Sequence, residues 1–491
     1  MKQLLAIFLL IGTMTHAQSY EQDILRFSYN DYNGTSRFVG VGGAFSSVGA
    51  DFSNLSHNPA GIGMYRSSIF VASPSLFIPK TTSSYLGTSR DKSQPQFVYG
   101  SVGAVFSTGD LKKENKGLIN NAAIGLGLNR TADFSRKEIM EGFNENGSIV
   151  DTWQAEVISM NGSNDVSVNP EDGFSFEAHN AYWAYLVNYD STVASYTTPI
   201  EDSVLQHRIM TTTGGKNEIV LSAGANYADK LYFGATIGVP YLNYDRTTIF
   251  TETDEEDANP DFEEFKSTQT YNTTGLGYNL KAGIIYKPND YIRIGAAVQT
   301  PEKLSLTETY SSSIESRVFG FTESNQSPEG TFDYQVRLPW RANAGVSFFF
   351  KKYGFIAFDY EAVDYGSMKY LFADEYAARE EEINLNIDTS YTLAHNFRVG
   401  IEIIPVKKLR IRAGYSYQGS PFDEKLGLED YGMVTQHFSG GFGIVHNRIA
   451  FDMAYRHSVS KEIEYPYAGV EAVKKEIVKP MVSMTIAYKL Q

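Results

Sequence analysis

The chain contains no cysteine among its 491 residues. It therefore has no disulfide framework, no thiolate metal site, no cysteine nucleophile and no cysteine for lipid attachment. Long apolar runs are also missing. After the first residues, no stretch approaches the ~20 uninterrupted apolar residues that a membrane-spanning helix needs. If the protein lies in a membrane, it must cross it with strands.

Basic residues are fewer than acidic ones: the chain has 42 Lys and Arg and 57 Asp and Glu, which gives a formal net charge of −15. This balance argues against nucleic acid as a partner, because phosphate contacts need a basic face. Sequence motifs for chemistry are missing as well. The 8 histidines show no metal-ligand spacing such as HExxH, and no Ser/His/Asp order or paired-carboxylate motif stands out. We expect no catalytic residues, no cofactor and no metal site.

The first residues predict export. "MKQLLAIFLLIGTMTHAQS" has a Lys near its start, an apolar run over residues 4–11 and a small-residue site that ends at Ala17. Together these features describe a secretory signal peptide. We expect residues 1–17 to be removed by cleavage after Ala17.

From Arg66 onward, apolar and polar residues alternate, which is typical of strands with two different environments on their faces. In "LRIRAGYSYQ" (residues 409–418), for example, apolar and aromatic residues alternate with charged and small or polar ones. About fourteen such segments follow one another, an even number, as in single-chain bacterial barrels. The last segment alternates to the chain end and is expected to pair with the first.

The connections between these segments alternate between short turns and long loops, and the longest covers about 135–215. An outer-membrane barrel has short periplasmic turns and long extracellular loops. A soluble β protein is the alternative, but its connections have no reason to alternate, and its strands average about 5 to 6 residues. The sequence thus predicts an all-β fold: a transmembrane antiparallel β-barrel of about 14 strands over residues 66–491, with residues 135–215 as an extracellular loop.

Before the first strand, "FSNLSHNPAGIGMYR" (residues 52–66) is rich in turn-forming residues and cannot pair in a sheet. The longer stretch "RFVGVGGAFSSVGADFSNLSHNPAGIGMYR" resembles the start of the FadL family of outer-membrane transporters for long-chain fatty acids and other hydrophobic compounds. "GLGYNLKAGIIYKPNDYIRIGAAVQTPEK" and "RLPWRANAGVSF" are similar to later strands of that family. The resemblance looks closest to members from Bacteroidetes-type bacteria, some of which carry a haemin-receptor label.

The resemblance implies that residues 18–65 form a hatch inside the lumen, with Asn58, Pro59, Ala60 and Gly61 as its motif. It also implies passive uptake of a hydrophobic small molecule across the bacterial outer membrane by a monomer in contact with lipid and lipopolysaccharide. In the family, ligands leave sideways through a gap in the wall. We expect this gap at Gly125 and Gly127, where a bulge would be tolerated.

Two groups of residues are candidates for ligand contact. The loop aromatics Trp153, Tyr182, Trp183 and Tyr185 either pack together or capture an apolar ligand. If apolar side chains face lipid, charged residues of the strands face the lumen. There they form a structural network that holds the hatch, or they meet a ligand carboxylate. This second group is Arg341, Arg398, Glu402, Arg410, Arg412, Asp452 and Arg456. A turn centred near Val406 places Glu402 opposite Arg410.

Two other functions stay open. A barrel of this kind could serve as a structural or docking protein for a secretion or surface-protein partner. It could also bind haemin, for which His57 is the one candidate axial ligand, although a hydrogen-bonding role in the hatch is the simpler interpretation.

Overall fold

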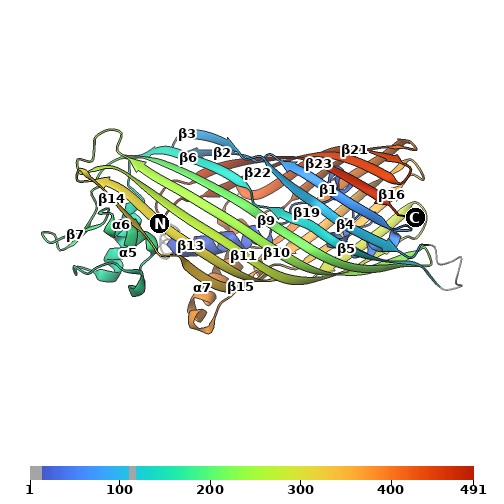
Figure 1. The fold of residues 1–491 in the computed structure, drawn as a ribbon, viewed down its shortest axis with the longest axis horizontal. Helices are drawn as coiled ribbons and strands as arrows, with labels where there is room; N and C mark the ends of the chain where they lie inside the picture. The colour runs from blue at the N-terminus through green and yellow to red at the C-terminus, as the bar shows by residue number, and fades with distance from the viewer. Residues whose placement is uncertain (1–13, 110–117, 429, 491) are drawn as a thin grey trace.

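The alternating segments form one closed antiparallel barrel of 14 strands in a computed structural model that describes residues 14–109, 118–428 and 430–490. The first and last strands close the sheet, with Ile69 opposite Lys489 and Phe77 opposite Met481. Figure 1 shows the barrel lying along its long axis, with a largely helical N-terminal segment inside it. The all-β fold and the strand number predicted from the sequence are confirmed.

Several barrel strands are continuous. They are β9 (Val204–Tyr227), β10 (Leu231–Thr253), β11 (Phe262–Tyr286), β19 (Leu393–Val406), β20 (Leu409–Gln418), β21 (Gly432–His446), β22 (Ile449–Glu464) and β23 (Val473–Lys489). Others consist of two or three pieces in line. These are β1 (Ile69–Phe77) with β2 (Lys80–Tyr85), β3 (Thr88–Ser93) with β4 (Gln96–Ser107), β5 (Ile119–Asp133) with β6 (Arg136–Asn144), β12 (Ile292–Gln299) with β13 (Lys303–Val318), β14 (Phe321–Gln326) with β15 (Gly330–Arg337) and β16 (Arg341–Phe349), and β17 (Gly354–Asp364) with β18 (Lys369–Leu371).

Prolines mark most of the breaks. Pro79, Pro95, Pro301 and Pro339 each lie between two pieces of one barrel strand. Proline cannot donate a ladder hydrogen bond, so the sheet is interrupted where it occurs.

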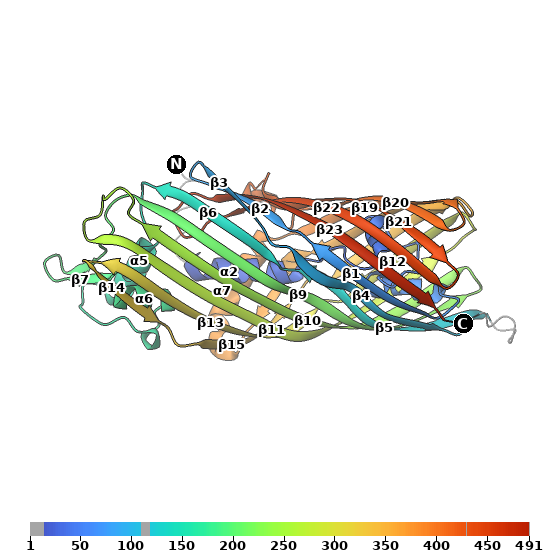
Figure 2. The same ribbon diagram turned by 45° about the horizontal axis from the view of Figure 1, so that its top comes forward.

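The long connections, such as residues 145–203, 254–261 and 372–392, all lie at one end of the barrel, and most connections at the other end are short turns, as Figures 1 and 2 show. The end with the long connections also has two-residue turns at 86–87 and 319–320, so the long connection expected at 313–330 is largely strand. The end with the short turns is the periplasmic end of an outer-membrane barrel. The long loop expected at about 135–215 is shorter than predicted, because β6 and the outer part of β9 continue the wall. The insert between them covers residues 145–203 and contains α5 (Val150–Asn161), η3 (Pro170–Asp172), α6 (Phe176–Trp183) and the hairpin of β7 (Asn188–Asp190) and β8 (Ser195–Thr197).

The outward face of the wall is apolar, and aromatic side chains gather near both edges of the apolar band. Near the short turns they include Tyr286, Tyr291, Phe350 and Tyr353, each 48–59% exposed. Toward the outer end they include Phe97, Tyr99, Tyr278 and Phe397, each 53–62% exposed. Such belts mark the two surfaces of a bilayer.

The N-terminal segment, which we call the hatch, lies inside the barrel. Its elements are α2 (Met14–Ser28), α3 (Ser36–Gly40), α4 (Asn54–His57) and η1 (Pro59–Met64). Residues 1–13 of the expected signal peptide lie outside the described residues, and the last four residues of that peptide form the first turn of α2. No helix in the described ranges is both long and apolar enough to cross a membrane.

Further helical turns lie in the outer part of the barrel, one between β17 and β18 and the others in outer connections. These are η4 (Tyr365–Ser367), η5 (Asp374–Tyr376), α7 (Ala377–Ser390) and η6 (Glu424–Leu426). Of these, α7 packs against α2 through Ile383 and Ile387, so an outer connection reaches the helix in the lumen.

Candidate functional site

The Asn-Pro-Ala motif forms a turn that contacts the barrel wall. The Asn58 side chain caps η1 by accepting a hydrogen bond from the Ala60 amide (3.1 Å). Its amide group donates to the Ser46 carbonyl (2.5 Å) within the hatch and to the Ile284 carbonyl (3.4 Å) of β11. Pro59 follows at the first helical position, where its missing N–H costs nothing.

The wall carries glycines where this turn approaches it. A Cβ added to Gly283 would lie 2.0 Å from Asn58 Oδ1, and one added to Gly234 would lie 2.3 Å from the Pro59 carbonyl oxygen. Both glycines thus allow the hatch backbone to lie directly against the sheet.

Replacing Gly283 with Ala should therefore displace the motif turn from the wall. We expect Gly283→Ala to raise the ion conductance of the purified barrel in planar bilayers, because the hatch can no longer fill the lumen. Gly440→Ala is the control, since the nearest atom to its added Cβ is the Arg412 carbonyl oxygen at 3.7 Å. Equal conductance of the two variants would contradict this role for Gly283.

Charged residues of the wall meet the hatch in the lumen. Arg37 of α3 donates two hydrogen bonds to Glu402 (3.0 and 3.2 Å), which also accepts from Arg412 Nε (2.7 Å). Arg412 in turn donates to Asp452 (2.5 Å). We call these four residues the ion chain. Arg410 lies beside it, half-buried, with its Nη1 atom lacking a hydrogen-bond partner.

The remaining wall arginines hold the segment between α2 and α3. Arg456 donates to the Tyr32 carbonyl (2.8 Å) and to Asn33 Oδ1 (3.2 Å), and the Arg398 guanidinium lies over the Tyr32 ring at 4.6 Å. Arg341 donates to the Ser28 carbonyl. All three side chains are buried and contact other groups of the protein. This arrangement is that of a structural network rather than of a free site for a ligand carboxylate.

The expected register at the β19–β20 turn is wrong by two residues. Glu402 lies opposite Arg412, and Gly400 lies opposite Gly414. The turn is centred on Lys407 and Lys408, and an irregularity between Ile403 and Val406 adds to the shift. The alternation of faces is unaffected, because a shift of two residues preserves the side that each residue faces.

The outer half of the lumen contains an apolar cluster to which α2 contributes. Ile24, Leu25 and Phe27 are at most 3% exposed. They pack against wall and loop residues, which together form the upper lumen cluster: Ala132, Phe134, Leu242, Tyr244, Leu304, Leu306, Tyr334, Val336, Leu338, Val363, Tyr365, Met368, Tyr370, Ile383, Ile387, Tyr391 and Ala394. The apolar path inside the barrel is thus filled by the chain's own helix.

A gap in the wall lies beside this cluster, between β4 and β5. Their ladder runs from Ser107 opposite Ala123 to Ser101 opposite Asn129 and ends there. Farther toward the outer end, residues 96–100 of β4 do not pair with residues 130–133 of β5, although each strand stays paired with its other neighbour. Farther out, β3 and β6 approach again, and Arg90 forms an ion pair with Glu141.

The hatch fills this gap with residues 31–34. The Asp31 amide donates to the Thr131 carbonyl (2.8 Å), and the Asp133 amide donates to Asp31 Oδ2 (3.0 Å). On the other side, a Cβ added to Gly100 would lie 2.8 Å from the Gly34 carbonyl oxygen. The hatch segment therefore lies where two neighbouring strands of the wall would otherwise pair.

Gly125 and Gly127 do not interrupt the wall, contrary to the expectation from sequence. Gly125 pairs with Val105 and Ser222, and Gly127 pairs with Gly103 and Val220, without a bulge at either residue. Their missing side chains make room for the hatch instead, since an added Cβ at Gly125 would lie 2.7 Å from Leu55. The break begins two residues later, beyond Asn129, and the pairing of β4 with β1 has an irregularity at the same level, between Ser73 and Pro74.

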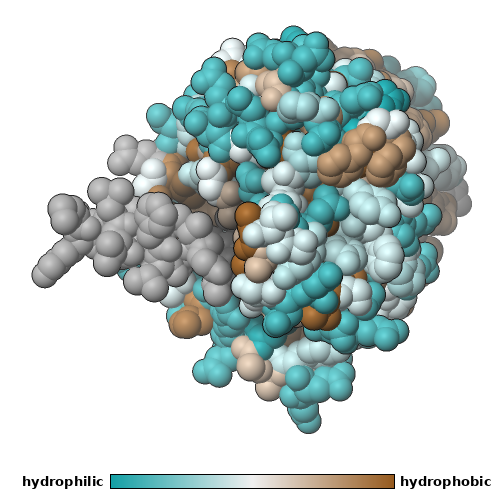
Figure 3. Space-filling model, turned by 90° about the vertical axis from the view of Figure 1, so that its left-hand side faces the viewer, coloured by the Kyte–Doolittle hydropathy of each residue, from teal (hydrophilic) through white to brown (hydrophobic). Residues whose placement is uncertain are grey.

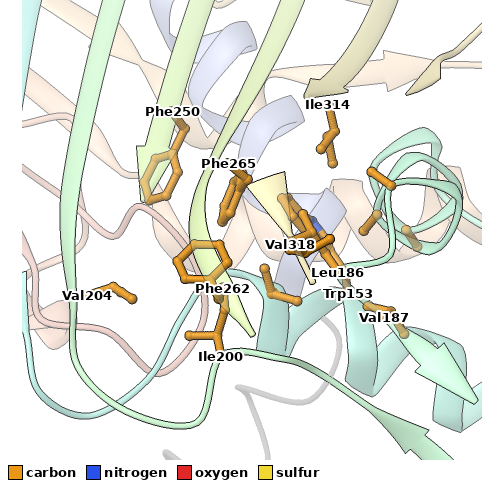
Figure 4. Close-up of a cluster of buried hydrophobic side chains, with 14 of the residues drawn as sticks. Trp153, Leu186, Val187, Ile200, Val204, Phe250, Phe262, Phe265, Ile314 and Val318 are labelled. Carbon is orange, nitrogen blue, oxygen red and sulfur yellow. The ribbon is translucent and has the colours of Figure 1, made fainter. Parts of the chain in front are cut away.

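The four loop aromatics have different environments. Trp153 is 5% exposed and packs edge-on against Phe265 in a core between the insert and the outer wall, shown in Figure 4. Tyr182 is partly buried at the edge of that core. Trp183 and Tyr185 are 49% and 45% exposed, so only these two present large aromatic surface to solvent.

A polar cavity lies between the hatch and the wall near the gap. Its lining includes Asn30, Asn33, His57, Glu218 and Lys281. His57 stacks on Phe38 with ring centroids 4.6 Å apart, and the charged groups around the cavity do not form the apolar slot that a porphyrin needs. Among the residues described, no group of three or more His, Asp or Glu side chains could hold a metal ion.

Comparisons with known proteins agree with this architecture. Residues 229–427 match the family model described as "Outer membrane protein transport protein (OMPP1/FadL/TodX)". This part of the chain is thus similar to the FadL/TodX family of outer-membrane transport proteins. This similarity and the closed 14-strand barrel agree with the outer-membrane location that the sequence predicted. No curated protein matches the sequence.

Several solved structures resemble this chain along most of its length. The P. putida toluene transporter TodX gives a TM-score of 0.53 at 12% identity, covering 94% of this chain and 100% of TodX. A Pseudomonas aeruginosa FadL homologue gives 0.56 at 10% identity, with coverage of 94% and 100%. The Ralstonia pickettii toluene transporter TbuX gives 0.50 at 15% identity, again with 94% and 100%. At such identities these structures show the shared fold.

Proposed function

We propose that this barrel is a member of the FadL family and lets hydrophobic small molecules, such as long-chain fatty acids or monoaromatic hydrocarbons, cross the outer membrane passively as a monomer. One observation carries the proposal: the upper lumen cluster is apolar and extends to the gap in the wall. Ala132 of β5 and Phe134, which directly follows β5, belong to the cluster and lie next to the gap. Phe134 contacts Phe27 of α2 with ring centroids 6.1 Å apart.

The pathway follows from this continuity. A ligand enters from the outer end and replaces α2 against the apolar wall, because both offer apolar surface to the same side chains. Displacement of α2 pulls on residues 31–34, which follow it directly in the chain and fill the gap. The ligand then leaves sideways between β4 and β5, where Phe97 and Tyr99 face the lipid. No charged ligand group is needed, since Arg341, Arg398 and Arg456 are already held by protein groups.

The direct test is uptake by cells that make the protein and lack other barrels of this family. Radiolabelled oleate and toluene serve as probes, and a polar sugar of similar size serves as the control solute. Faster uptake of either hydrophobic probe, with unchanged sugar uptake, supports the proposal. The proposal would be refuted if cells with the barrel took up both probes no faster than cells without it. Comparing the uptake of oleate with that of toluene also shows which of the two ligand classes the barrel carries.

Exposed aromatics at the outer end are proposed as the first contact of the ligand. Tyr185 lies edge-on to Phe321 (5.7 Å between centroids), and Trp183, Tyr185, Phe319 and Phe321 are each 42–49% exposed. We expect the double variant W183S/Y185S to lower the initial rate of oleate uptake about two- to tenfold, since each aromatic supplies apolar area to the captured ligand.

The matched control for this prediction is Trp153→Phe, which keeps an aromatic ring in the buried core of the insert. Its uptake should equal that of the wild type. If W183S/Y185S has normal uptake but no longer retains a protein partner from the same cells, the exposed aromatics serve docking, as expected for a structural barrel, and not ligand capture.

A further inference from the structure

The two ends of the barrel carry opposite charge. The insert of residues 145–203 contains ten Asp and Glu and not a single Lys or Arg. The outer connection at 254–261 adds five acidic residues, again without a basic one. At the other end, the described turns and chain ends carry nine basic residues against two acidic ones, which are Asp229 and Asp290. We call these basic residues the periplasmic rim: Arg66, Lys230, Lys287, Lys351, Lys352, Lys407, Lys408, Arg448 and Lys489.

Most of the rim has no acidic partner. Arg66 pairs with Asp229 (3.3 Å) and Lys287 with Asp290 (2.6 Å), where the hydrogen bond from Lys287 lowers the pKa of the Asp290 carboxyl. For the other seven basic residues, the described part of the chain offers no ion pair. Lys351, Lys352, Lys407 and Lys408 are exposed in two neighbouring short turns, between β16 and β17 and between β19 and β20.

The rim lies directly beyond the aromatic belt. Lys351 and Lys352 lie between Phe350 and Tyr353, which are 54% and 59% exposed, and Lys489 follows Tyr488. Aromatic belts lie at the level of lipid headgroups, and long basic side chains next to them reach the same level. The charges of the rim are therefore at the height of the phosphates of the inner leaflet.

From this placement we infer that the periplasmic rim binds anionic phospholipid headgroups of the inner leaflet of the outer membrane. The basic residues are spread over the turns β9–β10, β11–β12, β16–β17, β19–β20 and β21–β22 and the end of β23, which are distributed around the barrel (Figures 1 and 2). A ring of charges fits a surrounding layer of headgroups, whereas an acidic protein partner would need them gathered on one side.

The acidic outer end complements this rim. Figure 3 views that end and shows a mostly hydrophilic surface. An acidic surface is repelled by anionic headgroups, so the charge distribution favours one orientation of the barrel relative to a layer of anionic phospholipid. This inference concerns the lipid contact alone and is independent of which ligand the channel carries.

Native mass spectrometry of the full-length protein tests the inference. The detergent-solubilised barrel is mixed with equal amounts of phosphatidylglycerol and phosphatidylcholine, and retained lipids are counted. We expect the wild type to retain several-fold more phosphatidylglycerol, because each basic residue near an anionic surface strengthens binding about fivefold. The rim variant K351Q/K352Q/K407Q/K408Q should lose most of this preference.

The control variant K92Q/K266Q/K461Q/K474Q removes four exposed lysines of the outer half and changes the net charge equally. It should retain the wild-type preference. A second measurement needs no variant: raising the salt from about 0.1 to about 1 M shortens the screening length from about 10 to about 3 Å and should abolish the preference.

Three outcomes would overturn the inference. They are a wild type without preference for phosphatidylglycerol, a preference that both variants lose equally, and a rim variant that keeps its lipid preference but no longer retains an acidic periplasmic protein. The last outcome would assign the rim to a protein partner.

Discussion

Uptake of oleate and toluene should stop when the hatch is tied to the wall by a disulfide and resume when the disulfide is reduced. Ser36 of α3 and Ser483 of β23 lie with their Oγ atoms 3.0 Å apart. This separation brings the sulfur atoms of S36C/S483C close to bonding distance. Because the chain has no cysteine of its own, no other disulfide can form within it. We expect oxidised S36C/S483C to show an uptake rate at least about tenfold below that of the reduced protein, since gating by displacement needs a mobile hatch.

The control for this experiment is T270C/S311C. Thr270 and Ser311 are cross-strand partners in β11 and β13, with their hydroxyl oxygens 2.7 Å apart. A disulfide there links two strands of the wall and leaves the hatch free, so uptake should be the same in oxidised and reduced protein. If S36C/S483C is fully cross-linked by mass spectrometry and still transports at the reduced rate, the hatch does not have to move.

Removing Glu402 should give the largest loss of stability. Glu402 is 3% exposed and is the carboxylate that Arg37 of the hatch and Arg412 of the wall share. Breaking a buried ion pair by removing one partner costs about 3–5 kcal/mol, because the remaining charges stay buried without compensation. In Glu402→Ala, Arg412 keeps Asp452 but Arg37 loses its carboxylate, so we expect a loss near the lower end of this range in urea unfolding of the barrel in detergent, together with a raised ion conductance as α3 loses its anchor.

Arg317→Gln provides the comparison at the surface. Arg317 pairs with Glu263 (3.2 Å) and Glu264 (3.3 Å), and all three side chains are 44–58% exposed. Exposed ion pairs contribute about 0–1 kcal/mol, so this variant should unfold almost like the wild type. A loss as large in Arg317→Gln as in Glu402→Ala would show that the ion chain has no special role in holding the hatch.

The barrel was predictable from sequence because its signals are local. Alternation along each strand reports which side faces lipid, and the order of short and long connections reports which end is periplasmic. The register between strands was harder. The Glu402 pairing was wrong by two residues because the turn at Lys407 and the irregularity before it leave no mark in the alternation, which repeats every two residues.

The route through the lumen was less accessible to sequence analysis. Ile24, Leu25 and Phe27 form an apolar group, but their burial depends on wall residues that come hundreds of positions later. The gap was sought at Gly125 and Gly127 because glycine permits a bulge, whereas it begins beyond Asn129, and the residues of β4 that lack a partner in β5 directly follow Pro95. Proline in a strand is a visible signal for an interrupted ladder, and weighing Pro95 more heavily would have moved the expected gap closer to its place.

The occupancy of the upper lumen cluster by α2 has a consequence for selectivity in the proposed pathway. A helix tethered to the wall is a competitor at an effective concentration of about millimolar or more, and every ligand has to displace it. A ligand therefore has to bind the upper lumen cluster more favourably than the side chains of Ile24, Leu25 and Phe27 do. Molecules that bury less apolar surface than these three side chains leave the helix in place, so the tethered helix sets a lower limit on the hydrophobicity of what passes.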